Sequence, residues 1–341
     1  MATEAPGEKN TEGWTHATPY PLCIECGDHR SQVYVAAEAQ AVSILAASIA
    51  ISRSTPFNGA ALGPLTSDEL RRENEMNYGD TALLGIDVGF SKSRPTTGIA
   101  WSANGTFGAA KTHTDWDRRR QYLPTATTYS VIAIDGPLVP AGSPALLVRM
   151  CEQTLARGAF QKRCKPGSSH FGTGLQLKRA ALETAEQIKH LASAPMFENA
   201  VFGDAAIVEA FPNAFLGVLM PEQTFGTTQI LRRRKFDWMY EHVIEAGRLA
   251  ELMAFVGWDA PEFLQSMQTE RDHERRAAYI CLLTAACAVA GKAKVVGDVA
   301  GGWIWLPPTD LWASWARTAL DQNLARADET LGDATFRSSA P

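Results

Sequence analysis

The pattern of hydrophobic and polar positions predicts a mixed α/β protein. Short apolar runs rich in β-branched residues alternate with longer segments in which apolar residues recur at helical spacing. The predicted strands cover residues 83–89, 97–102, 107–112, 129–134, 206–211 and 303–308. The predicted helices cover residues 33–52, 144–157, 175–191, 235–256, 273–290 and 311–327. We therefore expect a mixed sheet, three antiparallel strands followed by parallel strands, flanked by helices.

Turn-forming residues and polar stretches divide the chain into three parts. Residues 1–80 hold a polar arm, an Ala-rich helix and a linker with Pro and Gly. Residues 81–327 form the main domain, and residues 328–341 a disordered tail. Glu38 and Gln40 interrupt the apolar helix at 33–52, which is too short for a convincing membrane span. We expect that helix to be buried or to contact a protein partner rather than a membrane.

Composition and charge narrow the class of protein. The 341 residues are 45% hydrophobic and 20% charged, as in ordinary globular proteins. The N-terminus lacks the basic segment of a secretory signal, so we expect a cytoplasmic protein with reduced cysteines. With a net charge of −5, contact with DNA or RNA would need local basic segments. The candidates, which are otherwise solvated loops, are Lys162, Arg163 and Lys165, and then Arg232, Arg233, Arg234 and Lys235.

The cysteines give little support to a zinc site. Cys23, Cys26 and His29 have the spacing of half a site, with His16 as a further candidate. Structural zinc takes four ligands, and no second Cys-x-x-Cys or His pair follows nearby. We therefore expect no structural zinc there. Cys281 and Cys287 lie on an apolar helix, where we expect them in the core.

Acidic residues at the ends of predicted strands are the strongest chemical signal. Asp87, Asp135 and Glu209 each end an apolar run, and Asp272 and Glu274 open a later helix. Converging carboxylates bind hard cations such as Mg²⁺ or Mn²⁺, and two such ions can activate a water against a phosphodiester. The predicted metal ligands are Asp87, Asp135, Glu209 and Glu274, with Asp272 as a further catalytic candidate.

Each of these residues also has a purely structural interpretation. Asp87 and Asp135 can be turn formers after buried strands, and Glu209 can cap the next helix. Asp272 and Glu274 can be acids favoured by the helix dipole. Arg149, Glu152 and His273 are expected to support the site. Alternatively, Arg149 and Glu152 form a simple ion pair, and His273 is a surface residue.

Several short motifs, taken in order, resemble a known family. They are Gly85-Ile86-Asp87, Ile134-Asp135-Gly136-Pro137-Leu138, Arg149-Met150-Cys151-Glu152, Glu209-Ala210-Phe211-Pro212, Glu274-Arg275-Arg276-Ala277-Ala278, Cys281-Leu282-Leu283-Thr284-Ala285 and Gly302-Trp303-Ile304. Over residues 81–308 the chain resembles the predicted-nuclease family catalogued as domain-of-unknown-function family 429, of ribonuclease-H-like and RuvC-like fold. The resemblance implies metal-binding acids at Asp87, Asp135, Glu209 and Glu274. It also implies a second helix acid, where this chain has Ala277.

The sequence therefore predicts a metal-dependent nuclease or phosphodiesterase of ribonuclease-H-like fold, with water as the nucleophile. Ala277 favours an alternative, a catalytically silent binding or scaffold protein. A third candidate is an actin-like kinase or ATPase, because residues 85–92 resemble a first phosphate loop. Asp135-Gly136-Pro137 does not fit the second phosphate loop of that fold. Gly301-Gly302, the candidate for its adenosine-binding Gly-Gly motif, is followed by an apolar run typical of a strand.

Overall fold

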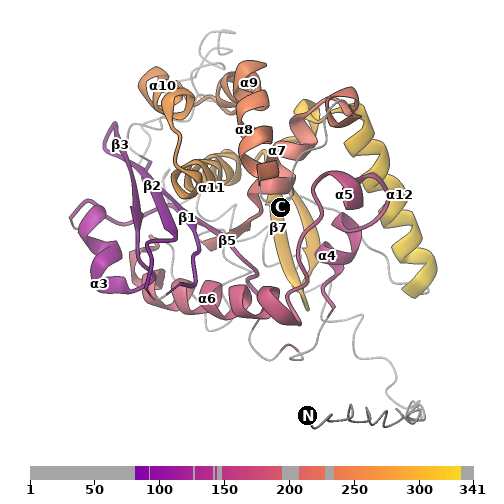
Figure 1. Cartoon of the computed structure of the whole chain (residues 1–341), viewed down its shortest axis with the longest axis horizontal. Helices are drawn as coiled ribbons and strands as arrows, with labels where there is room; N and C mark the ends of the chain where they lie inside the picture. Colours follow the sequence, from indigo (N-terminus) through magenta and orange to yellow (C-terminus); the bar gives the residue numbers. More distant parts are fainter. Residues whose placement is uncertain are drawn as a thin grey trace, which may run out of the picture. The chain divides into compact units, whose positions relative to one another are not determined.

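A mixed β-sheet forms the centre of the part of the chain that the structure describes (Figure 1). The computed structural model describes residues 81–91, 93–125, 127–140, 143, 148–193, 207–226 and 234–331. All of them belong to one compact unit. The seven strands are β1 (Leu83–Asp87), β2 (Thr97–Ala103), β3 (Thr106–Thr112), β4 (Val131–Asp135), β5 (Ile207–Ala210), β6 (Lys294–Asp298) and β7 (Gly302–Leu306).

The strand order is β3-β2-β1-β4-β5-β7-β6. Strands β1, β2 and β3 pair in antiparallel fashion, as short connections between successive strands favour. β1, β4, β5 and β7 run parallel, and β6 pairs antiparallel with β7 at the far edge. The expectation of a mixed α/β sheet, antiparallel first and then parallel, is confirmed.

Helices cover both faces of the sheet (Figure 1). On one face, α6 packs against β4 over a core that includes Leu84, Ile86 and Ile132. On the other face, α11 packs against β1, β2 and β4. The helices are α3 (Trp116–Arg119), α4 (Met150–Leu155), α5 (Gly158–Arg163), α6 (Gly172–Ile188), α7 (Pro212–Leu219), α8 (Lys235–Glu245), α9 (Arg248–Val256), α10 (Pro261–Thr269), α11 (His273–Val289) and α12 (Ser314–Leu331).

Helix α11 lies unusually close to the strands because two glycines leave room for its backbone. A Cβ atom at Gly85 would lie 2.3 Å from the Leu282 backbone nitrogen. A Cβ atom at Gly98 would lie 1.9 Å from the Glu274 carbonyl oxygen. The helix is buried from Arg276 to Ala288, which is expected for a helix that is apolar on all sides. This close packing places the N-terminus of α11 over the start of β2.

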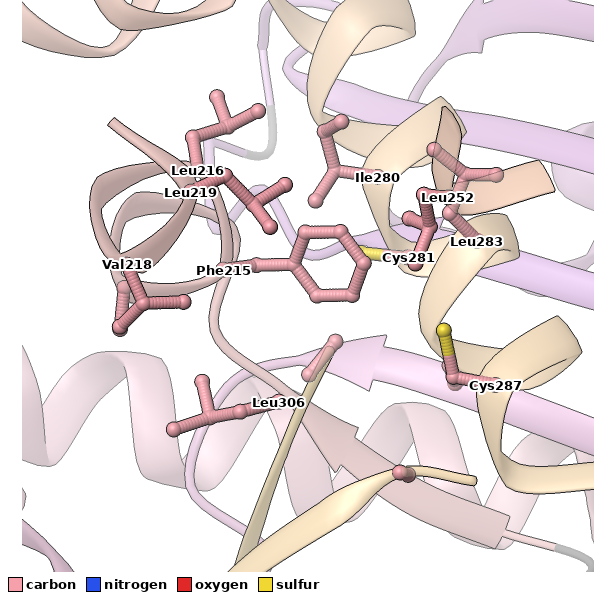
Figure 2. Close-up of a cluster of buried hydrophobic side chains, with 14 of the residues drawn as sticks. Phe215, Leu216, Val218, Leu219, Leu252, Ile280, Cys281, Leu283, Cys287 and Leu306 are labelled. Carbon is pink, nitrogen blue, oxygen red and sulfur yellow. The ribbon is translucent and has the colours of Figure 1, made fainter. Parts of the chain in front are cut away.

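The second side of α11 is covered by α7 and α9. Figure 2 shows the Phe215 ring of α7 between Leu306 of β7 and the α11 residues Ile280 and Cys281. Cys281 and Cys287 are fully buried in this cluster, which confirms their predicted place in the core. They are free thiols, as are Cys151 and Cys164. Apolar side chains therefore pack against α11 both on the side of the sheet and on the side of α7 and α9.

Several predicted boundaries were wrong. The helix in the range 144–157 is α4, Met150–Leu155. Arg149 has an extended backbone and comes just before its first turn. The helix predicted at 235–256 is two helices, α8 and α9, since Gly247 adopts a left-handed conformation with φ of 71° between them. Strand β6 was not predicted. The last helix extends beyond residue 327 to Leu331.

Some predictions concern residues outside the described ranges. They are the arm, helix and linker at 1–80, including the helix at 33–52, the cysteine motif of Cys23, Cys26 and His29, and the tail beyond residue 331. In the ranges that are described, no helix is long and apolar enough to cross a membrane.

Candidate functional site

Asp87 and Asp135 lie side by side at the carboxyl ends of β1 and β4. The two residues are register partners in the parallel ladder. Side chains alternate along a strand, so Asp87 shares the face of Gly85, which contacts α11. Both aspartates are half-buried. Ligands of open α/β sheets bind beyond the carboxyl ends of the strands, so this is the expected edge for a site.

The same row of the sheet continues across two more strands. Asp87 pairs with Gly98 of β2, and Gly98 pairs with Lys111 of β3. Register partners project from the same face of a sheet, so Lys111 lies on the α11 face together with the two aspartates. Gly98 leaves a gap in the row, and the backbone of α11 at Glu274 fills it.

The carboxyl groups of Asp87 and Asp135 lie in a buried environment dominated by negative charge. Burial raises the pKa of Asp87 well above its usual value, and the charges of Asp135, Glu274 and Asp272 raise it further, while Lys111 opposes them. Burial and the charge of Glu209 raise the pKa of Asp135 to about 7. Among the described residues, none donates a hydrogen bond to either carboxylate. A cation beside these carboxylates would relieve the repulsion between them.

Lys111 binds both acids at the N-terminus of α11. Its Nζ atom lies 2.6 Å from Oε2 of Glu274 and 3.1 Å from Oδ2 of Asp272. Asp272 is also the N-cap of α11, where it accepts a hydrogen bond from the Arg275 backbone nitrogen at 3.1 Å. The interpretation of Asp272 as a helix-terminus acid is therefore confirmed. The role of Lys111 could not be predicted from the sequence, because only the register of β3 brings this residue to the acids.

Glu209 is buried and fully engaged by other groups. Arg149 Nη1 and Nη2 donate to its two carboxylate oxygens at 2.9 and 2.5 Å, and the Leu138 backbone nitrogen donates to Oε2 at 2.8 Å. In the sheet, Glu209 pairs with Ile134, so it projects from the face opposite to Asp135. The interpretation of Glu209 as a helix cap was wrong: α7 begins after Phe211 without a side-chain cap.

Arg149 extends this buried network to other segments. Its Nε atom donates to the Gly301 carbonyl at 2.5 Å, and Nη1 lies 3.3 Å from Oε1 of Glu152. The predicted Arg149–Glu152 ion pair is therefore confirmed. Glu152 in turn accepts a hydrogen bond from the Ser169 backbone nitrogen at 3.1 Å. Arg149 thus joins α4, β5 and the β6–β7 turn.

His273 is half-exposed and links α11 to α8. Its Nδ1 atom lies 3.1 Å from Oδ2 of Asp237, and its ring contacts Phe236 edge-on with centroids 5.1 Å apart. The side chain is 50% exposed. It contacts α8 rather than either strand-end aspartate, which agrees with the surface interpretation.

The two basic segments meet near the start of α8. Lys235 Nζ donates to the Lys162 carbonyl oxygen at 2.7 Å. Lys162, Lys165 and Arg234 are exposed. Arg163 is different, because it pairs with Glu222 and stacks on the Trp315 ring 4.5 Å from its centroid. Arg232 and Arg233 lie outside the described residues.

The donor set at the strand ends is small. In the described ranges, no three His, Cys, Asp or Glu side chains gather in a geometry that could hold a metal ion. Asp87 and Asp135 nevertheless fit Mg²⁺ or Mn²⁺, because Mg²⁺ is commonly held by one or two carboxylates and completes its shell with water and substrate phosphate. Glu209 and Glu274 each have a basic partner already.

Comparison of the chain with family models, with curated proteins and with solved structures gave no match. Its function is therefore inferred from the geometry of the site.

Proposed function

We propose that the chain is a divalent-metal-dependent hydrolase of phosphodiester bonds with a ribonuclease-H-like fold. The observation that carries this proposal is the alignment of Asp87 with Asp135 at the carboxyl ends of two adjacent parallel strands. Rigid strands hold the two carboxylates in place, and their mutual repulsion favours a bound cation.

The strand order supports the fold assignment. The first five strands are arranged β3-β2-β1-β4-β5, with β1 to β3 antiparallel and β4 and β5 parallel to β1. This is the mixed sheet that the sequence motifs led us to expect for a ribonuclease-H-like domain. β6 and β7 extend it at the far edge.

Each group of residues has a distinct role in the proposed enzyme. Asp87 and Asp135 hold Mg²⁺ or Mn²⁺, which supplies an activated water and neutralises phosphate charge when bound. The Arg149–Glu209 pair fixes β5 and the segment after β4, and so keeps Asp135 in position. Asp272 and Glu274 add negative charge beside Asp87.

The basic segments suggest nucleic acid, DNA or RNA, as the substrate class. α8 begins at Lys235, and the neighbouring Phe236 contacts His273 at the start of α11. The exposed Lys162 and Lys165 lie on the segment joined to Lys235. Basic side chains of this kind bind a phosphate backbone without reading its sequence. The start of α8 therefore lies at the same end of α11 as Asp272 and Glu274.

A second candidate is a binding protein that keeps the fold without catalysis. Two observations favour it: Arg149 occupies both oxygens of Glu209, and the buried Ala277 offers no second carboxylate on α11. A kinase is not proposed, because Gly302 begins β7 and the Gly301 backbone bonds to Arg149 and Asp298.

Calorimetric titration with Mn²⁺ separates the two candidates. We expect saturable binding by the parent protein, and its loss in Asp87→Asn and Asp135→Asn. Asp117→Asn is the matched control, since that carboxyl is 79% exposed on α3 and should leave binding unchanged. Mn²⁺-dependent cleavage of single- and double-stranded DNA and RNA would then identify the substrate. A parent protein that binds no Mn²⁺ would favour the silent binding protein.

A further inference from the structure

Among the described residues, Lys111 is the one basic residue in the same row of the sheet as Asp87 and Asp135. The row runs from Lys111 through Gly98 to Asp87 and then Asp135. Neighbouring strands lie about 4.8 Å apart, so the Lys111 backbone is about 10 Å from that of Asp87. Lys111 is therefore a fixed part of the site, although it comes from a strand that carries no other candidate residue.

The Lys111 ammonium contacts both acids at the N-terminus of α11. Its Nζ atom contacts Glu274 at 2.6 Å and Asp272 at 3.1 Å. The three side chains are 33%, 17% and 23% exposed, respectively, so water only partly screens them. A cation held by Glu274 would have to displace the ammonium or lie next to it, and like charges repel.

The acids of the site therefore fall into two sets. Glu274 and Asp272 have a built-in cation, whereas Asp87 and Asp135 have none among the described residues. Glu209 is bound on both oxygens by Arg149 and projects from the other face of the sheet. Among the described residues, the strand-end pair is therefore the set of site acids whose carboxylates have no ion-pair partner.

The geometry points to Lys111 as the residue that restricts this site to a single divalent cation, by supplying a fixed positive charge where a second ion would bind. This inference rests on the proposed function and sets its metal content at one ion per chain. Asp87 and Asp135 hold the ion, and Lys111 holds Glu274 and Asp272. Lys111 is a specificity-determining residue: it sets how many ions bind and does not itself hold one.

The number of Mn²⁺ ions bound per full-length chain tests this role. Calorimetry on the parent protein is expected to give one ion. Lys111→Met removes the charge and keeps an apolar stem, and is expected to give two. Lys111→Arg restores a cation and is expected to give one. Lys189→Met is the matched control, because Lys189 also contacts a carboxylate at 2.6 Å, that of Glu186, outside the row.

Mn²⁺ electron paramagnetic resonance gives a second readout that needs no activity. A spin-coupled pair of ions is expected in Lys111→Met and isolated ions in the parent protein. Two ions in the parent protein, or a single ion in a folded Lys111→Met variant, would overturn the role of Lys111 and leave the proposed function standing. If Lys111→Met does not fold, Lys111→Gln is compared in its place. A parent protein that binds none overturns both proposals.

Discussion

Arg149 and Glu209 form a two-bonded ion pair in which neither side chain is more than 4% exposed. The pair connects the start of α4 to the middle of the sheet. Such a pair is costly to break, because removing one partner leaves a buried charge without compensation.

Loss of Arg149 should therefore destabilise the protein strongly. We expect Arg149→Met to lower the free energy of unfolding by about 3–5 kcal/mol, the usual cost of breaking a buried ion pair. Urea denaturation measures this change. The double variant Arg149→Met/Glu209→Leu should recover part of the loss, because it removes both charges. Arg317→Met, on an exposed part of α12, should change stability by less than ~0.5 kcal/mol. Equal effects of the two arginine variants would contradict this prediction.

The pKa of Asp135 predicts how stability depends on pH. This pKa rises from an ordinary value of 3.8 to about 7 in the folded protein. The folded state therefore binds a proton that the unfolded state releases, so stability falls as pH rises between these values. Without added metal, we expect the free energy of unfolding to be higher at pH 5 than at pH 8, and the difference to shrink in Asp135→Asn.

Added Mn²⁺ should raise stability at pH 8, because it binds the ionised carboxylates of the folded state. Thermal denaturation at both pH values, with Asp117→Asn as the control, measures both effects. An unchanged pH dependence in Asp135→Asn would show that the carboxyl titrates normally.

The close packing of α11 against β2 predicts that one methyl group added at Gly98 destabilises the protein. In Gly98→Ala the new Cβ would lie 1.9 Å from the Glu274 carbonyl, so α11 must move. We expect a loss of about 1–3 kcal/mol, the usual cost of overpacking, together with weaker Mn²⁺ binding. Gly226→Ala is the control, because its Cβ would meet no atom within 4 Å. A Gly98→Ala variant as stable as the parent would mean that α11 adjusts at no cost.

Ala277 predicts a gain of metal binding. It lies one turn after Glu274 and one turn before Cys281, whose thiol pKa is raised by burial and by the charges of Asp135 and Asp87. A carboxylate at position 277 would therefore face the same pair. We expect Ala277→Asp to lower the melting temperature in chelator and to show a larger rise on adding Mn²⁺ than the parent protein.

Ala277→Asn is the matched control, with nearly the same shape and no charge. It should be destabilised without any added gain from Mn²⁺. The same Mn²⁺ response in both variants would show that position 277 does not face the aspartate pair.

Some elements could be predicted from the sequence and others could not, for physical reasons. β1 and β4 were predictable because each is a short apolar run ending in a polar residue, and α11 because it is long and apolar. β6 was missed, since five residues including Gly297 and Asp298 give a weak strand signal. Lys111 and the Arg149–Glu209 bonds depend on register between distant segments. No local pattern reports such contacts, so only the structure reveals them.

The position of α11 also has a consequence for how the chain folds during synthesis. The strands that it covers, β1, β2 and β4, are complete by Asp135, but α11 ends at Val289. At ~5–20 residues per second, the ribosome needs about 8–30 s to make the roughly 150 residues between them. For that time one apolar face of the nascent sheet has no helix to cover it, so the newly made chain should depend on chaperones more than its final stability suggests.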